Sequence, residues 1–185
     1  DRHAAKKAID LIEFPGAPRL FSAGRLDKNS EGLLLFSNDG DWIEKLTHPR
    51  HRTRKVYRVT ADFPLTKAQI ALLVGPGVES DGEILRADEV RPDGPRRWIF
   101  ILSEGKNREI RRMLESFGNR TRRLQRIAVG ELKLGTLPVG KWRFLSPEEV
   151  DAAQKNGKWK EKTPENVKKA QKRARIDLLF RKKKV

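Results

Sequence analysis

The stretch AGRLDKNSEGLLLFSNDG, from Ala23 to Gly40, joins a polar turn to a run of four apolar residues. Gly32–Ser37 has the length and composition of a strand, and turn residues bound it on both sides. The turn carries a carboxylate, Asp27, in a chain that is otherwise strongly basic. Asp27 can be a turn former, an ion-pair partner or a reactive group, and residues elsewhere in the chain must distinguish these roles.

The chain of 185 residues holds 41 Lys and Arg against 25 Asp and Glu, a formal net charge of +16. Its length suits one domain, or one domain with an appendage. A charge of this sign and size predicts a polyanionic partner, of which nucleic acid is the commonest. An anionic membrane is the competing partner, but no apolar stretch approaches the roughly 18 residues that span a bilayer. We therefore expect a nucleic-acid partner and no membrane.

Two residue types limit the chemistry. The chain has no cysteine, which excludes disulfides, cysteine nucleophiles and thiolate zinc sites and agrees with a reducing, cytoplasmic location. No signal-peptide pattern opens the sequence. His48 and His51 have a spacing seen in metal sites, but Pro49 disfavours a helix there and no acidic cluster is adjacent. We expect no metal site, and a loop or RNA-facing patch at these histidines.

The positive charge is concentrated in the last part of the chain. Residues 154–185 hold thirteen Lys and Arg against three Asp and Glu, which is +10 of the total +16. We predict a body, residues 1–153, in which a short helix starts at Pro147, and a basic tail, residues 154–185. The tail is expected to be a linker over 157–164 and then a basic helix starting at Pro164. It is either solvated or in contact with RNA.

Strands and helices interleave in the body without regular βαβ spacing. Gly32–Ser37, Lys55–Ala61 and Arg97–Ser103 are rich in apolar, β-branched and aromatic residues and predict strands. The pattern predicts a helix over 65–74, with Thr66 near its start, and short strands joined by Asp-Gly turns over 81–95. The expected fold class is α+β, with a mixed or antiparallel sheet.

The second informative stretch is SEGKNREIRRMLESFGNRTRRLQR. Ile110, Met113, Leu114 and Phe117 follow helical spacing and form one apolar face, and Gly118 suits the left-handed residue that ends a helix. This stretch therefore predicts an amphipathic helix that packs on the core.

The arginines of this helix have different positions around the apolar face. At 100° per residue, Arg112 lies opposite the face, beside Arg108, where a solvated or phosphate-facing role is natural. Arg111 lies at the border, where it can reach inward if a carboxylate pairs with it. Asp27 is the candidate partner. On these residues alone, a purely structural salt bridge and a catalytic pair both remain open.

Three motifs, in this order, are similar to those of the pseudouridine synthases that modify bacterial ribosomal RNA: GRLDKNSEGLLLFSNDG, KVYRV and LSEGKNREIRRM. LPVGKWRFLSPEEV resembles the end of their catalytic domain, so the similarity spans about residues 21–150. It implies the pseudouridine synthase fold, with a mixed, mainly antiparallel central sheet flanked by helices.

The resemblance also implies roles for single residues. Asp27 matches the catalytic aspartate, Tyr57 the aromatic residue that stacks on the target base and is implicated in proton transfer at C5, and Arg111 the arginine that pairs with the aspartate. We predict charged atoms of Asp27 and Arg111 within roughly 4 Å, in a cleft that Tyr57 also lines. Arg25 matches the arginine that holds the opened RNA. Further expected RNA contacts are Arg54, Lys55, Lys106, Asn107, Arg108 and Arg112.

The implied reaction isomerises uridine in ribosomal RNA, or in a pre-ribosomal particle, without cofactor or metal. The base is extruded from the RNA, and an ionised Asp27 acts as nucleophile at C1′ or C6, or as base at C2′. A monomer is expected. A non-catalytic RNA-binding or ribosome-assembly protein explains the charge equally well, but not the combination of Asp27, Tyr57 and Arg111. A DNA-binding protein lacks a recognisable helix-turn-helix or zinc pattern.

The sequence departs from the family's pattern in two places. Ser30 stands where the family usually has threonine, which keeps a hydroxyl for bonding within the turn. The N-terminal RNA-binding module and a KPxG-type motif, both normally upstream, are absent from these 185 residues. Either the chain is trimmed, which we favour, or its body and tail bind RNA.

Overall fold

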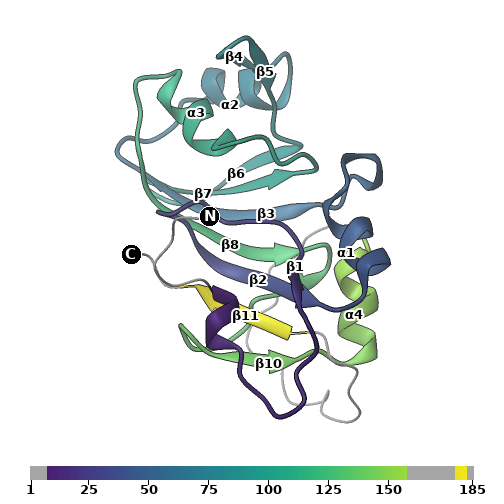
Figure 1. Ribbon diagram of the computed structural model, residues 1–185. Helices are drawn as coiled ribbons and strands as arrows, with labels where there is room; N and C mark the ends of the chain where they lie inside the picture. The colour runs from purple at the N-terminus through teal and green to yellow at the C-terminus, as the bar shows by residue number, and fades with distance from the viewer. Residues whose placement is uncertain (1–7, 158–177, 183–185) are drawn as a thin grey trace.

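A mixed nine-stranded sheet is the centre of the structure, a computed structural model that describes residues 8–157 and 178–182 (Figure 1). The strands are β1 (Phe21–Ser22), β2 (Glu31–Ser37), β3 (Lys55–Ala61), β6 (Glu89–Gly94), β7 (Arg97–Leu102), β8 (Thr121–Val129), β9 (Leu132–Lys133), β10 (Trp142–Phe144) and β11 (Leu178–Lys182). Their order is β10-β11-β2-β8-β3-β7-β6, with β1 beside β2 and β9 beside β8. Only β2 and β8 pair in parallel among the described strands. The predicted α+β class with a mixed sheet is confirmed.

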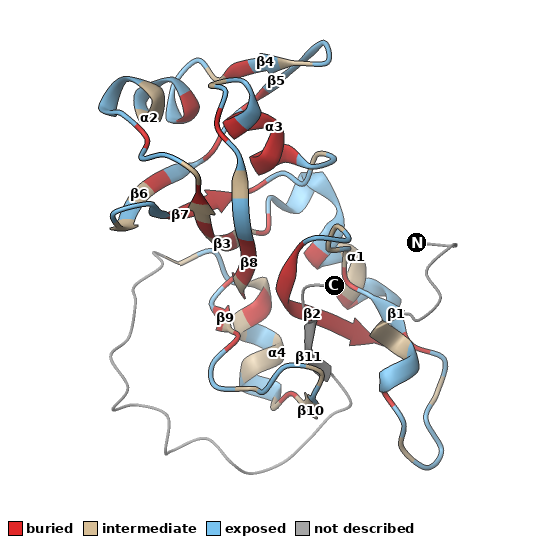
Figure 2. Ribbon diagram, turned by 90° about the vertical axis from the view of Figure 1, so that its left-hand side faces the viewer, coloured by how far each residue is buried: buried red, intermediate tan, exposed pale blue. Residues whose placement is uncertain are grey.

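β2 is buried on both faces, which explains why its sequence is continuously apolar rather than alternating. Leu33 and Leu35 pack with the helices α1 (Gly40–Thr47) and α4 (Pro147–Gln154). Leu34 and Phe36 pack on the opposite face, against the N-terminal segment that contains the short 3-10 helix η1 (Ala8–Leu11) and against β10. Figure 2 shows the resulting run of buried residues along this strand.

The other half of the sheet is covered by α2 (Lys67–Val74), α3 (Glu109–Glu115) and a hairpin of β4 (Val78–Ser80) and β5 (Glu83–Leu85). Figure 1 shows these four elements together at the top of the molecule. Phe100 of β7, Leu73 of α2 and Met113 of α3 are fully buried in the shared core. A second 3-10 turn, η2 (Pro49–His51), connects α1 to β3.

Residues that favour helix ends and tight turns lie at the ends of several of these elements. Thr66 and Gln69 form a reciprocal cap at the start of α2, and Ser146 caps α4 at Pro147. α3 is followed by Gly118, whose φ of +67° is the left-handed conformation that its sequence position predicts. Asp81-Gly82, one of the two predicted Asp-Gly turns, lies between β4 and β5.

The predicted linker and basic helix of the tail lie mostly outside the described residues. Leu178–Lys182, however, forms β11 and pairs with both β10 and β2. The prediction of an appendage over the whole of 154–185 is therefore wrong for these five residues. The physical reason is pairing, because β11 satisfies backbone N–H and C=O groups on the side of β2 that β8 leaves open.

Gly32 brings β2 against β8 at the centre of the sheet. Its φ is +112°, and a Cβ built there would lie 2.2 Å from the carbonyl oxygen of Arg126. A residue other than glycine would therefore push the two strands apart.

In the residues that the structure describes, no helix is long and apolar enough to cross a membrane.

Candidate active site

A cavity of about 410 Å³ lies where β3 and β8 meet the turn before β2 and the loop before α3. Asp27 and Tyr57 both line it, as the sequence predicted. The other predicted site residues in its wall are Arg25, Lys55, Lys106, Asn107 and Arg108. Arg54, Arg111 and Arg112 lie outside its lining. The three motifs thus meet around one cavity, although the third motif contributes its loop rather than Arg111.

The Asp27 turn is held by backbone bonds. The N–H of Ser30 donates to the carbonyl oxygen of Asp27 at 2.9 Å. Arg126 Nη1 donates to the carbonyl of Arg25 at 3.2 Å and fixes the turn to β8. The hydroxyl of Ser30 is buried and has no hydrogen-bond partner among the described residues, so the expected turn bond comes from its backbone instead. Asp27, at the start of this turn, lines the cavity.

Arg111 points inward, as its border position on the helix predicted. It is 8% exposed, and its Nη2 and Nη1 donate to the carbonyls of Asn29, at 2.8 Å, and Thr121, at 3.4 Å. Burial lowers the pKa of Arg111, the charge of Arg108 lowers it further, and attraction to Asp27 opposes both. Asp27 and Arg111 therefore interact electrostatically across the wall of the cavity. Their separation of 4 Å or less stays a prediction.

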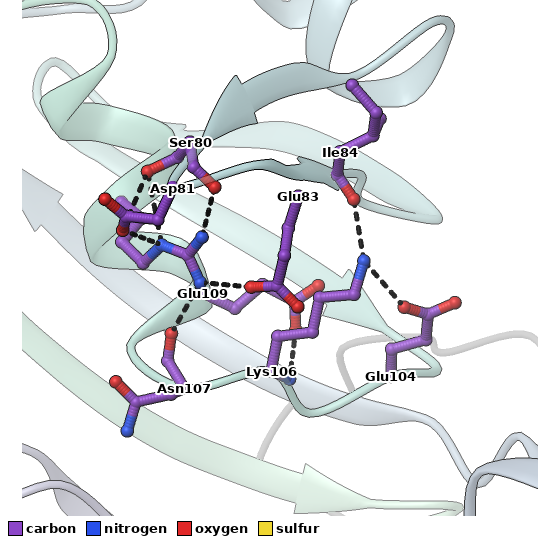
Figure 3. A network of polar contacts seen from close by, with 9 residues as sticks. Ser80, Asp81, Glu83, Ile84, Glu104, Lys106, Asn107 and Glu109 are labelled. Carbon is purple, nitrogen blue, oxygen red and sulfur yellow. Dashed lines mark hydrogen bonds and ion pairs between the residues drawn. The ribbon is translucent and has the colours of Figure 1, made fainter.

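The solvated, phosphate-facing position predicted for Arg112 is wrong. Arg112 is 9% exposed, and its guanidinium bonds the side chain of Glu83 at 2.6 Å and both the hydroxyl and the carbonyl of Ser80. Asp81 adds an ion pair at 3.1 Å (Figure 3). The β4–β5 hairpin folds over this side of α3, so Arg112 anchors the hairpin instead of facing RNA.

The loop before α3 presents its polar groups to the cavity from a fixed position. Lys106 Nζ bonds the carbonyl of Ile84 at 2.7 Å and pairs with Glu104 at 3.4 Å (Figure 3). The carboxylate of Glu109 accepts the backbone N–H of Lys106 at 3.1 Å. Arg108 is exposed and pairs with Glu115 at 3.1 Å. The loop is thus braced from both ends, with exposed donors at the rim of the cavity.

Two groups in the cavity wall have shifted pKa values. Burial raises the pKa of Glu109 to about 7, although the hydrogen bond from the backbone N–H of Lys106 acts to lower it. Burial also lowers the pKa of Lys55 to about 8, the charge of Arg126 lowers it further, and Glu109 opposes both. Sequence reasoning missed Glu109 and Arg126. The sequence offered one sign of each residue. Glu109 directly precedes Ile110 of the apolar helix face, and Arg126 lies within the sequence that forms β8.

Glu109→Gln should stabilise the protein at pH 8 and not at pH 4.5. Above pH 7 the folded state carries a buried carboxylate, whereas below pH 4.5 both states are protonated. The free energy of unfolding of the parent chain therefore falls as pH rises between these values. Glutamine carries no charge that burial would disfavour. The variant's gain in the free energy of unfolding at pH 8 should be on the order of 3 kcal/mol at most. Urea unfolding at both pH values measures it, and an equal gain at both would contradict the assignment.

Within the described ranges, no group of three or more His, Cys, Asp or Glu is placed to hold a metal ion. His48 and His51 lie near the surface instead. His51 Nε2 is 2.9 Å from Glu44 Oε2, and His48 Nδ1 accepts the backbone N–H of Arg50. These contacts fit the loop expected there.

Comparison with known proteins identifies the relatives of this chain. Residues 1–116 match the sequence model of the family described as RNA pseudouridylate synthase. The dual-specificity RNA pseudouridine synthase RluF of Escherichia coli (strain K12) is 36% identical over 142 residues, which are 76% of this chain and 49% of RluF. The ribosomal large subunit pseudouridine synthase E of Xanthomonas campestris is 36% identical over 151 residues, covering 72% of this chain and 81% of that protein.

A solved structure gives the same result for the fold. A crystal structure of a pseudouridylate synthase superposes with a TM-score of 0.74 at 29% sequence identity, covering 79% of this chain and 64% of that one. The fold implied by the motifs is confirmed. The chain spans about half the length of RluF and its curated counterparts. With a family match over more than half of its residues, the chain belongs to the RNA pseudouridylate synthase family.

Proposed function

We propose that this protein converts uridine in ribosomal RNA to pseudouridine, with Asp27 as the reacting group. The observation that carries the proposal is the cavity of about 410 Å³, because Asp27 of the first motif and Tyr57 of the second both line it. Arg111 of the third motif lies behind the wall and interacts with Asp27. Relatives named for large and small subunit synthases support ribosomal RNA as the substrate.

The reaction exchanges one bond for another without change of mass. The bond from N1 of uracil to C1′ of the ribose breaks, C5 of the base then joins C1′, the C5 proton leaves, and N1 gains a proton. An ionised carboxylate can start this as a nucleophile at C1′ or C6, or as a base at C2′. The positive charge of Arg111 attracts the Asp27 side chain in all three routes.

The remaining residues hold the substrate. A uridine inside folded RNA must leave its stack before the glycosidic bond can be reached, at a cost of a few kcal/mol. Tyr57, half-buried on β3, offers a ring for the extruded base to stack on. Exposed Arg25, Asn107 and Arg108 at the rim are placed to contact phosphates, and phosphate contacts position RNA without reading its sequence. Lys55 and Lys106 add positive charge to the cavity wall, and Arg54 adds another outside it.

The assembly and location of the protein are part of the same proposal. Ribosomal RNA or a pre-ribosomal particle is its partner, bound by a monomer in the cytoplasm, where bacterial ribosomes are assembled. The net charge of +16 supports a polyanionic partner.

Pseudouridine mapping tests the function. The purified chain is incubated with unmodified large and small subunit ribosomal RNA transcripts, and pseudouridine is located by carbodiimide-dependent primer extension. We expect stops at one or a few defined uridines that are absent without protein. Binding of both RNAs with no stop in either would instead favour a non-catalytic RNA-binding protein.

A further inference from the structure

Arg126 is a buried cation in the wall of the cavity with unused hydrogen-bonding capacity. It lies on β8 and is 3% exposed. Its Nε donates to the carbonyl of Leu33 at 2.8 Å and its Nη1 to the carbonyl of Arg25 at 3.2 Å. Its Nη2 is buried and has no partner among the residues that the structure describes. Two bonds thus hold the guanidinium in place, and its third nitrogen makes no hydrogen bond with the described residues.

Basic side chains outnumber acidic ones around Arg126, because the cavity lining holds Arg25, Lys55, Lys106, Arg108 and Arg126 against Asp27 and Glu109. The ion pairs found among the described residues do not include Arg126, and a buried charge without a partner is costly. Half-buried Lys55 adds a second positive charge to the same wall, and the pKa of Lys55 is lowered partly by Arg126. Glu109, the buried acid of this wall, has a pKa near 7 and neutralises the two cations only in part. The wall is therefore suited to a negative charge.

The register of the sheet directs Arg126 toward the same space as Tyr57. The two residues are paired across β3 and β8, so their side chains leave the same face of the sheet. Directly opposite residues in an antiparallel pair have Cβ atoms about 5 Å apart. A uracil stacked on the Tyr57 ring would therefore have an edge within reach of the guanidinium.

We propose that Arg126 Nη2 donates a hydrogen bond to a carbonyl oxygen of the extruded uracil and that its charge stabilises the negative charge formed on the base. This inference rests on the proposed function. When the N1–C1′ bond breaks, its electron pair stays on uracil and spreads to O2 and O4. Attack at C6 instead gives an enolate on O4. Each route for Asp27 thus puts negative charge on a uracil oxygen, which the positive charge of the guanidinium can stabilise.

The depth of Arg126 favours the base over a phosphate. Phosphates remain attached to the RNA chain at the mouth of the cavity, where Arg25, Asn107 and Arg108 are exposed. Arg126 is almost wholly covered, so the part of the substrate that enters furthest is the part that reaches it.

The test is a cycle that combines a protein change with a change of one substrate atom. The mapped uridine is placed in a synthetic RNA hairpin as uridine, 2-thiouridine or 4-thiouridine, or with a neutral methylphosphonate at its 5′ side. Single-turnover rates are measured for the parent chain and Arg126→Gln by nucleoside chromatography after digestion. Sulfur changes the intrinsic reactivity of the base equally for both proteins. A difference between the two proteins in the ratio of the uridine rate to the thiouridine rate therefore reports the contact between Arg126 and the substituted oxygen.

We expect Arg126→Gln to lower the rate on uridine about 10- to 100-fold, the effect of losing a hydrogen bond to an ionised group. The rate ratio should differ between parent and variant by about tenfold for one thiouridine. Arg123→Gln, on the exposed side of the same strand, should leave the ratio unchanged. If Arg126→Gln does not fold, Arg126→Lys, which keeps the charge, takes its place.

Two outcomes would overturn the inference. Coupling with the methylphosphonate alone would show that Arg126 binds a phosphate. Equal ratios for every substrate would show that it only holds the carbonyls of Leu33 and Arg25. Neither can be confused with failure of the proposed function, in which the parent chain makes no pseudouridine from the unsubstituted hairpin.

Discussion

Asp27→Asn should abolish pseudouridine formation, with a rate loss of about a thousandfold or more, while the protein stays folded and binds RNA. An amide is neither a nucleophile nor a base at neutral pH. The turn should survive, because its bond runs from the N–H of Ser30 to the main-chain carbonyl of residue 27. Single-turnover rates on ribosomal RNA, with binding measured in parallel, give the result.

Asp39→Asn is the matched control for this substitution. Asp39 lies in the same stretch of sequence and caps α1 by accepting the N–H of Trp42 at 3.0 Å. Asparagine caps helices about as well as aspartate, so this variant should keep both stability and rate. Turnover by Asp27→Asn within tenfold of the parent would remove Asp27 from the mechanism.

Arg111→Met should lower the rate about a hundredfold and also destabilise the fold. The rate falls because the cation that interacts with Asp27 is lost from a buried position, where fixed charges have large effects. The free energy of unfolding falls by about 1–3 kcal/mol, because the carbonyls of Asn29 and Thr121 lose their donor. Arg111→Lys keeps the charge without the two-pronged geometry and should recover part of the rate.

Arg143→Met separates the two effects. Arg143 makes two bonds of 2.6 Å to Glu149 of α4, away from the cavity, so its loss should reduce stability and leave the rate unchanged. Rates are compared well below the unfolding temperature of each variant. If Arg111→Met then reacts as fast as Arg143→Met, Arg111 has a structural role only.

Local patterns in the sequence were sufficient for much of the fold. The apolar run of β2, the β-branched run of β3 and the helical spacing of α3 each predicted an element that the structure contains. The inward direction of Arg111 also followed from sequence, because the angle between residues on a helix is fixed by its geometry.

Features that depend on distant partners could not be predicted in this way. Arg112 lies opposite the apolar stripe of α3, yet it is buried because the β4–β5 hairpin covers it with Ser80 and Glu83. Arg126 is buried where it donates to the carbonyls of Leu33 and Arg25, about a hundred residues earlier in the chain. β11 was missed because pairing with β2, rather than its own composition, determines its conformation. In each case the deciding contact is remote in sequence.

The central claim is that the cavity around Asp27 moves C1′ from N1 to C5 of uracil, and release of the C5 hydrogen measures this most directly. Ribosomal RNA transcripts labelled with tritium at C5 of uridine are incubated with excess protein, and tritium in water is followed with time. We predict that the parent chain releases tritium to a plateau that matches the number of mapped uridines, and that Asp27→Asn releases none in the same period. Tritium release by Asp27→Asn at the parent rate, or none from the parent chain on RNA that it binds, would contradict the account.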